Sequence, residues 1–72
     1  MRKQTLRAAR HRAKLTQEQL GAKSGVAQEV ISKLENGVIR RPSFDTVDNL
    51  ARALDVDPRS LKFGATQPEA VA

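Results

Sequence analysis

The chain has 72 residues, no cysteine and a formal net charge of +5. This length fits one domain, and the lack of thiols excludes disulfides and thiolate metal sites, so an all-helical core is expected. No apolar run approaches the ~20 residues that span a bilayer, and no apolar segment follows the basic N-terminus as in a signal peptide. We therefore expect a cytoplasmic protein without a membrane partner, and the basic balance favours a polyanionic partner.

The N-terminal segment predicts a basic amphipathic helix over about residues 3–14. Leu6, Ala9 and Ala13 recur at helical spacing, and we expect Leu6 and Ala9 to pack. Six of the 13 Lys and Arg residues lie in this segment without an acidic residue among them: Arg2, Lys3, Arg7, Arg10, Arg12 and Lys14. The single histidine, His11, has no companion at metal-ligand or catalytic spacing, so we expect it to be solvated.

A second helix is expected over residues 17–23. Thr16 and Gln19 have the spacing of a capping box, which places the helix start directly after Thr16. Gly25 suits the left-handed residue that ends a helix. The free N–H groups and the positive dipole end of this helix predict an anion site at its start. Two of its residues are expected in the core: Leu20 and Ala22.

A third helix is expected over residues 28–35, closed by Asn36 and Gly37. Ala27, Ile31 and Leu34 share one face of a helical wheel, which predicts a core side. The opposite face carries only polar side chains: Gln28, Glu29, Ser32, Lys33 and Asn36. One face is therefore expected to pack and the other to meet something polar.

The segment 16–37 resembles the helix-turn-helix of the lambda-like phage repressor and Cro proteins, the XRE family. The family's elements occur here as Thr16-Gln17, Gly25-Val26 and the run ISKLENG at 31–37, and the similarity covers about residues 4–63. The resemblance implies a compact, all-α domain of five helices, in which helices two and three form the helix-turn-helix. It also implies sequence-specific binding of double-stranded DNA.

The resemblance assigns residues to two kinds of DNA contact. Four side chains match base-reading positions: Gln28, Glu29, Ser32 and Lys33. Five match positions at the DNA backbone: Arg10, Gln17, Asn36, Arg40 and Arg41. A Gln can bridge adenine N6 and N7, and a Glu can accept from cytosine N4. Two assignments have alternatives, because Gln17 can serve only the helix start, and Glu29 can turn away and pair with Lys33 one turn later.

Two further positions bear on the motif. The family pairs the arginine that matches Arg10 with the glutamate that matches Glu35, and both residues are present. Ala27 departs from the pattern, because Ser, Thr or Asn commonly caps the third helix there. Since alanine cannot accept an amide hydrogen bond, this helix start is expected to be less stable by about 1 kcal/mol than a capped one.

The remainder of the chain predicts two more helices and a tail. Ser43 is a cap, and an apolar stripe follows it in the fourth helix: Phe44, Val47, Leu50, Ala51 and Leu54. Asp57-Pro58 predicts the start of a short fifth helix. Leu61 and Phe63 in that region are expected to close the core and are candidate dimer contacts. We expect the domain to cover residues 1–64 and residues 65–72 to form a flexible tail.

These features favour a small transcriptional regulator of the phage or plasmid type, located at the nucleoid of a bacterial or phage-infected cell. One recognition helix reads only a few base pairs, so we expect a repressor that binds a palindromic operator as a homodimer, with half-sites ~34 Å apart. The alternative is an antitoxin that blocks a toxin partner and regulates its own operon through the same motif. No nucleophile–base pair or metal cluster appears in the sequence, so we expect no enzymatic activity, no cofactor and no metal.

Overall fold

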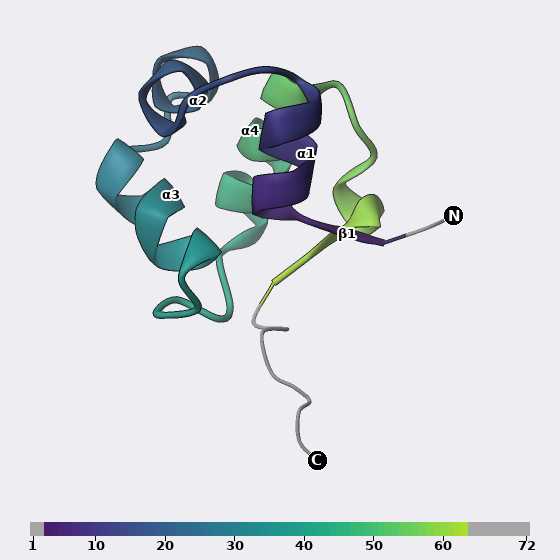
Figure 1. Ribbon diagram of the computed structural model, residues 1–72. Helices are drawn as coiled ribbons and strands as arrows, with labels where there is room; N and C mark the ends of the chain where they lie inside the picture. Colours follow the sequence, from purple (N-terminus) through teal and green to yellow (C-terminus); the bar gives the residue numbers. More distant parts are fainter. Residues whose placement is uncertain (1–2, 64–72) are drawn as a thin grey trace.

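The computed structural model describes residues 3–63 of the chain. Most of these residues form four α-helices (Figure 1). A very short pair of parallel strands brings the start of this part of the chain beside its end. The elements in chain order are β1 Gln4–Thr5, α1 Leu6–Arg12, α2 Gln17–Ser24, α3 Gln28–Glu35, α4 Phe44–Leu54, the 3₁₀ turn η1 Pro58–Ser60, and β2 Leu61–Lys62. The tail expected at residues 65–72 lies outside the described residues.

Local hydrogen bonds explain where α2 begins and ends. The Gln19 N–H donates to Thr16 Oγ1 at 3.0 Å, and the Thr16 N–H donates to Gln19 Oε1 at 2.9 Å. The expected capping box is therefore confirmed. Gly25 ends the helix with φ of +78°, in the left-handed region that glycine tolerates best.

The next two helices begin in different ways. Ala27 precedes α3 and provides no side-chain hydrogen bond, as the sequence predicted. Ser43 precedes α4, and its hydroxyl accepts from the Thr46 N–H at 3.2 Å. A side-chain cap is thus present at the start of α4 and absent from the start of α3.

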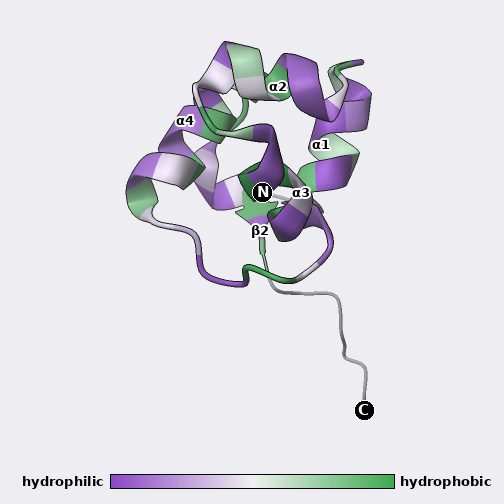
Figure 2. Ribbon diagram, turned by 90° about the vertical axis from the view of Figure 1, so that its left-hand side faces the viewer, coloured by the Kyte–Doolittle hydropathy of each residue, from purple (hydrophilic) through white to green (hydrophobic). Residues whose placement is uncertain are grey.

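The hydrophobic core lies where α2, α3 and α4 meet. Leu20, Ile31 and Leu50 contribute one fully buried side chain from each of these helices. Around them lie the smaller or less central members of the core: Leu6, Ala9, Val26, Leu34, Ala51, Ala53, Leu54 and Leu61. Figure 2 colours the ribbon by hydropathy and shows that each helix carries both hydrophobic and hydrophilic residues. This arrangement leaves one face of α3 outside the core.

Three apolar residues expected to face the core are exposed instead. Phe44 is 93% exposed at the first position of α4, and Ala22 and Ala27 are also exposed. Ala22 lies two positions after Leu20 in α2, about 200° around the helix, so the two side chains point apart. Ala27 precedes α3 with extended backbone angles, so a helical wheel does not describe its direction.

The fifth helix and the start of the first differ from expectation. Asp57 caps the turn as predicted, because its carboxylate accepts from the Arg59 N–H at 2.8 Å. However, the helical segment is only the 3₁₀ turn η1, and the chain then becomes extended as β2. β2 pairs with β1 in parallel, Gln4 opposite Leu61 and Thr5 opposite Lys62. The first helix therefore begins at Leu6, later than expected. No helix within residues 3–63 has the length and apolar character needed to cross a membrane.

Candidate nucleic-acid interface

The helix-turn-helix depends on a close approach between α2 and the turn after it. A Cβ added at Gly21 would lie 2.9 Å from the Val26 carbonyl oxygen and 3.5 Å from the Gln28 nitrogen. Real Cβ atoms do not approach a backbone atom as closely as 2.9 Å, so a larger side chain would force α2 and the turn apart. Packing of two backbones, rather than a side-chain cap, therefore holds this end of α3.

The outward face of α3 carries the four residues predicted to read bases. Gln28, Glu29 and Lys33 are exposed, and Ser32 is half-buried. Lys33 Nζ lies 3.3 Å from Glu29 Oε2, one helical turn away. The ion pair that the spacing favours is therefore present in the protein without DNA. The helix offers an amide, a hydroxyl and a neutralised pair of charges on one side.

The C-terminal end of α3 is fixed by a buried carboxylate. The side chain of Glu35 is fully shielded from solvent, and Arg10 is only 9% exposed. Arg10 Nε donates to Glu35 Oε2 at 2.6 Å, and Arg10 Nη2 donates to Oε1 at 3.0 Å. The predicted pairing is confirmed, and its bidentate geometry is the strong form of such a contact. Arg10 Nη1 also donates to the Leu15 carbonyl oxygen at 2.9 Å, so the guanidinium is held in one orientation.

Two more side chains reach the same carboxylate. Gln17 Nε2 donates to Glu35 Oε1 at 3.1 Å, and Arg7 Nε donates to it at 3.3 Å. Arg7 Nη2 further donates to Asn36 Oδ1 at 3.3 Å. We call Arg7, Arg10, Gln17 and Glu35 the Glu35 network. It joins α1, the first residue of α2 and the last residue of α3.

The network sets the charge state of its members. Burial acts to raise the pKa of Glu35, but the hydrogen bonds from Arg10, Gln17 and Arg7 outweigh it, so the pKa lies below its ordinary value. The hydrogen bond to Glu35 raises the pKa of Arg10, although burial opposes it. Both groups therefore remain charged near neutral pH.

Arg7 belongs to this network although the sequence did not single it out. It lies three positions before Arg10, a spacing that places two side chains on neighbouring parts of one helix face. That spacing could have suggested a second arginine at Glu35. It could not distinguish Arg7 from the other exposed basic residues of the same helix.

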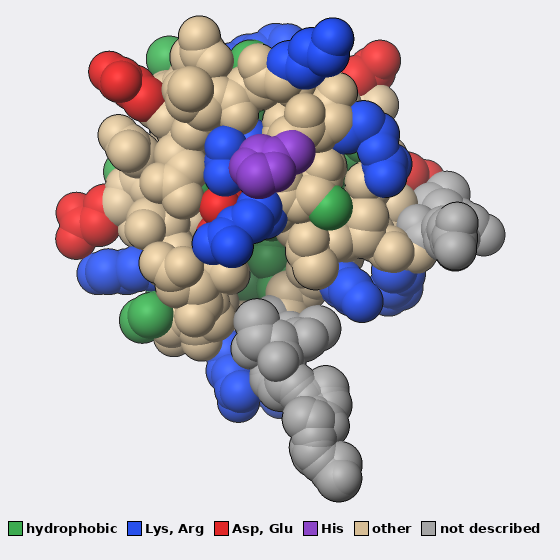
Figure 3. Space-filling view, in the orientation of Figure 1, with side chains coloured by type: hydrophobic (Ala, Val, Ile, Leu, Met, Phe, Trp, Pro, Cys, Tyr) green, Lys and Arg blue, Asp and Glu red, His purple; other side chains and the backbone are tan. Residues whose placement is uncertain are grey.

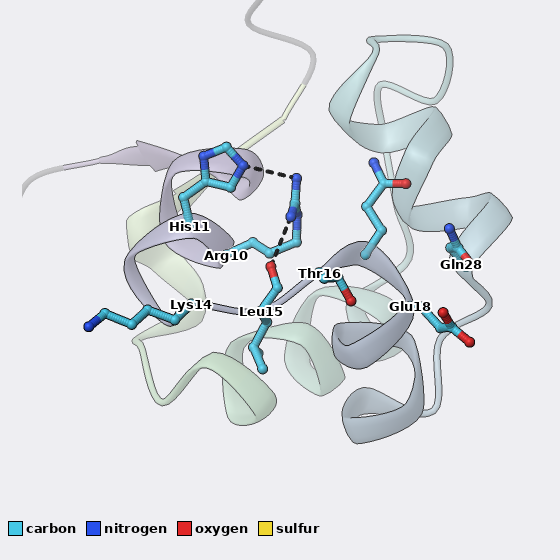
Figure 4. A pocket seen from close by; sticks show the side chains of 8 residues that line it. Arg10, His11, Lys14, Leu15, Thr16, Glu18 and Gln28 are labelled. Carbon is cyan, nitrogen blue, oxygen red and sulfur yellow. Dashed lines mark hydrogen bonds between the residues drawn. The ribbon is translucent and has the colours of Figure 1, made fainter.

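An open hollow of about 590 Å³ lies beside the start of α2. Its lining comes from α1, the loop after it, α2 and α3: Arg10, His11, Lys14, Leu15, Thr16, Gln17, Glu18 and Gln28. We call it the α2 hollow. Figure 4 shows Arg10 and His11 on one side of it and Gln28 on the other. Arg10 Nη2 and His11 Nε2 lie 3.3 Å apart. The structure thus brings two predicted backbone contacts, Arg10 and Gln17, together with the predicted base reader Gln28.

The other predicted site residues do not line the α2 hollow. Asn36, Arg40 and Arg41 are exposed at the end of α3 and in the loop after it. Figure 3 shows Lys and Arg side chains distributed over this side of the molecule, around its single histidine. The two candidate dimer residues differ, because Leu61 is 5% exposed and belongs to the core, whereas Phe63 is half-buried. The expectation that Leu61 closes the core is therefore confirmed, and its part in a dimer stays a prediction.

Comparisons with known proteins agree with this geometry. A family model described as helix-turn-helix matches residues 6–61. An uncharacterized HTH-type transcriptional regulator, y4dL of Sinorhizobium fredii, is 43% identical over 54 residues, 75% of this chain and 27% of the relative. The HTH-type transcriptional repressor RghR of Bacillus subtilis is 41% identical over 66 residues, 92% of this chain and 49% of that protein.

The coverage of these matches is uneven. The chain spans about a quarter of the first relative and about half of the second. No solved structure matches it with comparable significance. Because the family model covers well over half of the sequence, the family is nevertheless clear. The chain belongs to the XRE-type helix-turn-helix family of DNA-binding transcription regulators.

Proposed function

We infer that this chain binds a palindromic DNA operator as a dimer and represses transcription from it. The observation that carries the proposal is the Glu35 network, because it fixes α3 against α1 and α2 while the polar face of α3 stays open. Sequence reading needs such a fixed helix, since a misplaced hydrogen-bond donor cannot select a base edge.

The backbone contacts would set the register of the protein on DNA. A phosphate in the α2 hollow would meet the N–H groups at the start of α2 together with the Arg10 and Gln17 side chains. Glu35 holds both side chains at known positions, so they need little reordering on binding. Asn36, Arg40 and Arg41 would contact phosphates on the other side of α3.

The base contacts would come from α3. Gln28 stands first in the helix and would bridge adenine N6 and N7. Glu29 Oε2 is engaged by Lys33, and its other oxygen would accept from cytosine N4 while Lys33 donates to a guanine. The ion pair also offsets the repulsion between the carboxylate and nearby phosphates. Ser32 is half-buried and has a short side chain, so it would contact only a base edge that comes close to α3.

A dimer supplies the affinity that one short helix lacks. Two copies related by a two-fold axis would place their α3 helices in major grooves ~34 Å apart. Phe63 would contribute to the contact between copies, while Leu61 stays in the core. Occupation of such a site blocks transcription, and the relative RghR is named a repressor. The relatives' names favour this regulator over the antitoxin alternative.

Selection of bound duplexes from a random DNA pool at near-physiological salt tests the proposal, because non-specific binding is weakened there. We expect an inverted repeat whose half-site centres lie about ten base pairs apart. A pool that shows no enriched sequence would contradict operator binding. An enriched site without two-fold symmetry would contradict the dimer.

A reporter gene placed behind the selected operator tests the direction of regulation. Expression should fall when the protein is produced and recover in a Gln28→Ala variant. A rise in expression would mean that the protein activates transcription and does not repress it.

The assignment of Gln28 needs a separate comparison. Gln28→Ala should lose discrimination at one base pair by roughly 1–3 kcal/mol, about 5-fold to 160-fold in affinity. Asn49→Ala is the matched control, because Asn49 is an exposed amide on α4. If Gln28→Ala weakens binding to all sequences equally, Gln28 contacts the backbone instead.

A further inference from the structure

A second basic hollow lies away from the helix-turn-helix, where the strand pair meets α1. It has a volume of about 370 Å³, and its lining comes from the first and last elements of the fold: Lys3, Gln4, Thr5, Ala8, Arg12 and Lys62. We call it the strand hollow. Three of its six residues are cationic and none is acidic. The pairing of β1 with β2 creates it, because the strand register sets Lys62 beside Thr5.

The cations of the strand hollow lack the partners that similar residues have elsewhere. On α4 and η1, Arg52 pairs with Asp48, and Arg59 pairs with Asp57. Within residues 3–63, no salt bridge reaches Lys3, Arg12 or Lys62. Among the residues that the structure describes, the partner of Arg12 is neutral, because its Nη1 donates to Gln4 Oε1 at 3.0 Å. Three like charges around one hollow repel each other, and an anion bound there would relieve that repulsion.

The lining indicates which kind of anion fits. Ala8 is the only apolar residue among the six. A protein partner is usually held by an aromatic or aliphatic anchor in a pocket, and the strand hollow offers none. Phosphate groups need only cations and hydrogen-bond donors, so a nucleic-acid backbone fits better than an acidic protein segment.

The position of the strand hollow links it to the DNA contacts. Arg12 lies two residues after Arg10 on α1, about 200° around the helix, so the two guanidiniums lie on nearly opposite sides. A helix is roughly 10 Å across with its side chains, which corresponds to about three base pairs along a DNA strand. In Figure 3, Lys and Arg side chains lie around the histidine, which α1 carries. A DNA strand that reaches the strand hollow from the α2 hollow would therefore have to cross the outer face of α1 between them.

We propose that Lys3, Arg12 and Lys62 bind phosphates of the duplex that flanks each operator half-site. The contact extends the footprint by a few base pairs and carries no base preference. It rests on the operator binding proposed above, because the helix-turn-helix must first place α1 against the DNA. The strand hollow then adds affinity in proportion to the phosphates it neutralises.

The test compares two duplexes and two triple variants. The short duplex ends at the outer base pair of each half-site, and the long duplex adds ten base pairs at each end. The test variant is Lys3→Gln/Arg12→Gln/Lys62→Gln. The control variant, Lys23→Gln/Arg52→Gln/Arg59→Gln, removes the same charge from exposed residues of α2, α4 and η1.

We expect the unmodified protein to bind the long duplex at least tenfold more tightly than the short one at ~0.1 M salt. The test variant should bind both duplexes alike, and its salt dependence on the long duplex should weaken by about one unit of log–log slope for each lost contact. The control variant should keep the preference for the long duplex. Circular dichroism of each variant establishes that it is folded.

Two outcomes overturn the proposal. Equal binding of both duplexes by the unmodified protein would mean that flanking DNA is not contacted. A preference for the long duplex that survives in the test variant would assign that contact to other residues. Operator binding itself fails only if the unmodified protein does not distinguish the short operator from a scrambled short duplex, so the two failures are separable.

Discussion

The two ends of α3 are held by different means. At the C-terminal end, the fully buried Glu35 carboxylate accepts hydrogen bonds from Arg7, Arg10 and Gln17. At the N-terminal end, Ala27 provides no cap, and the backbone packs closely against α2 at Gly21 beside the buried side chains of Val26 and Ile31. One end is fixed by charge-assisted hydrogen bonds, and the other by shape.

This difference suits the base reading that we propose for α3. A helix start without a side-chain cap and with exposed polar side chains can exchange water for phosphates and bases without losing a capping hydrogen bond. A helix end locked to two neighbouring helices keeps the direction of those side chains constant. The charge-assisted hydrogen bonds therefore lie at the end of α3 opposite Gln28 and Glu29, the two base readers predicted in its first turn.

The largest effect should come from removing the carboxylate. Glu35→Ala leaves Arg10 buried without its partner, and breaking a buried pair in this way costs about 3 kcal/mol. Urea denaturation should show a lower midpoint with an unchanged slope. Glu29→Ala is the control on the same helix, because Glu29 is exposed, and it should change stability by less than about 0.5 kcal/mol. Similar losses in both variants would contradict the contrast between the two ends.

The opposite end should be sensitive to size rather than charge. Gly21→Val places a branched side chain where even a Cβ would lie 2.9 Å from the Val26 carbonyl oxygen. We expect a loss of about 2 kcal/mol from the forced separation of α2 and the turn. Ala22→Val puts the same side chain on the neighbouring, exposed position of α2 and should cost only the smaller helix-propensity difference. Equal losses of stability in thermal unfolding would mean that α2 and the turn leave room for a side chain at Gly21.

The ends of the helices could be predicted from the sequence because local chemistry determines them. Thr16, Gly25 and Ser43 act within a few residues of their position, and each occurs where expected. The pairing of Arg10 with Glu35 was predictable only through the family resemblance. Nothing in the sequence indicated that Gln17 donates to the same carboxylate, since that contact depends on how three helices pack.

The sequence-based expectations for Phe44 and for the chain ends are wrong for geometric reasons. Phe44 was assigned to the core because it begins a run of threes with Val47 and Leu50, but steps of three drift by about 60° each around a helix. At the first position of α4, the side chain has left the buried side and is 93% exposed. The strand pair was missed because two residues are too few to show alternation, and its pairing of chain ends is not a local property.

Acid should lower the stability that Glu35 contributes at the C-terminal end of α3. Since the folded pKa of Glu35 is lowered, its contribution to stability is fully present above the unfolded value of ~4.3 and is lost as the pH falls through the folded value. Glu35→Gln lacks this titration, so the stability gap between the two proteins should be widest at neutral pH and narrow in acid. Unfolding free energies measured from pH 7 to pH 3 test this. A gap that stays constant would mean that the carboxylate is not favoured by its partners.

The smallest expected effect is a gain in stability from a cap at the N-terminal end of α3. The backbone of Ala27, with φ of −59° and ψ of 140°, is close to that of two residues that do cap helices, Thr16 and Ser43. Ala27→Ser should therefore add a capping hydrogen bond and raise stability by about 0.5–1 kcal/mol, a few degrees in melting temperature.

Ala22→Ser is the control for that change, because a serine inside α2 has no free helix start to cap and should lower stability slightly. A gain at Ala27 alone would show that the N–H groups at the start of α3 lack partners in the free protein. Those groups would then be available to an anion such as a DNA phosphate. No gain at Ala27 would mean that the close approach at Gly21 already fixes this end as firmly as a cap can, and the contrast between the two ends of α3 would lie in the kind of contact rather than in its strength.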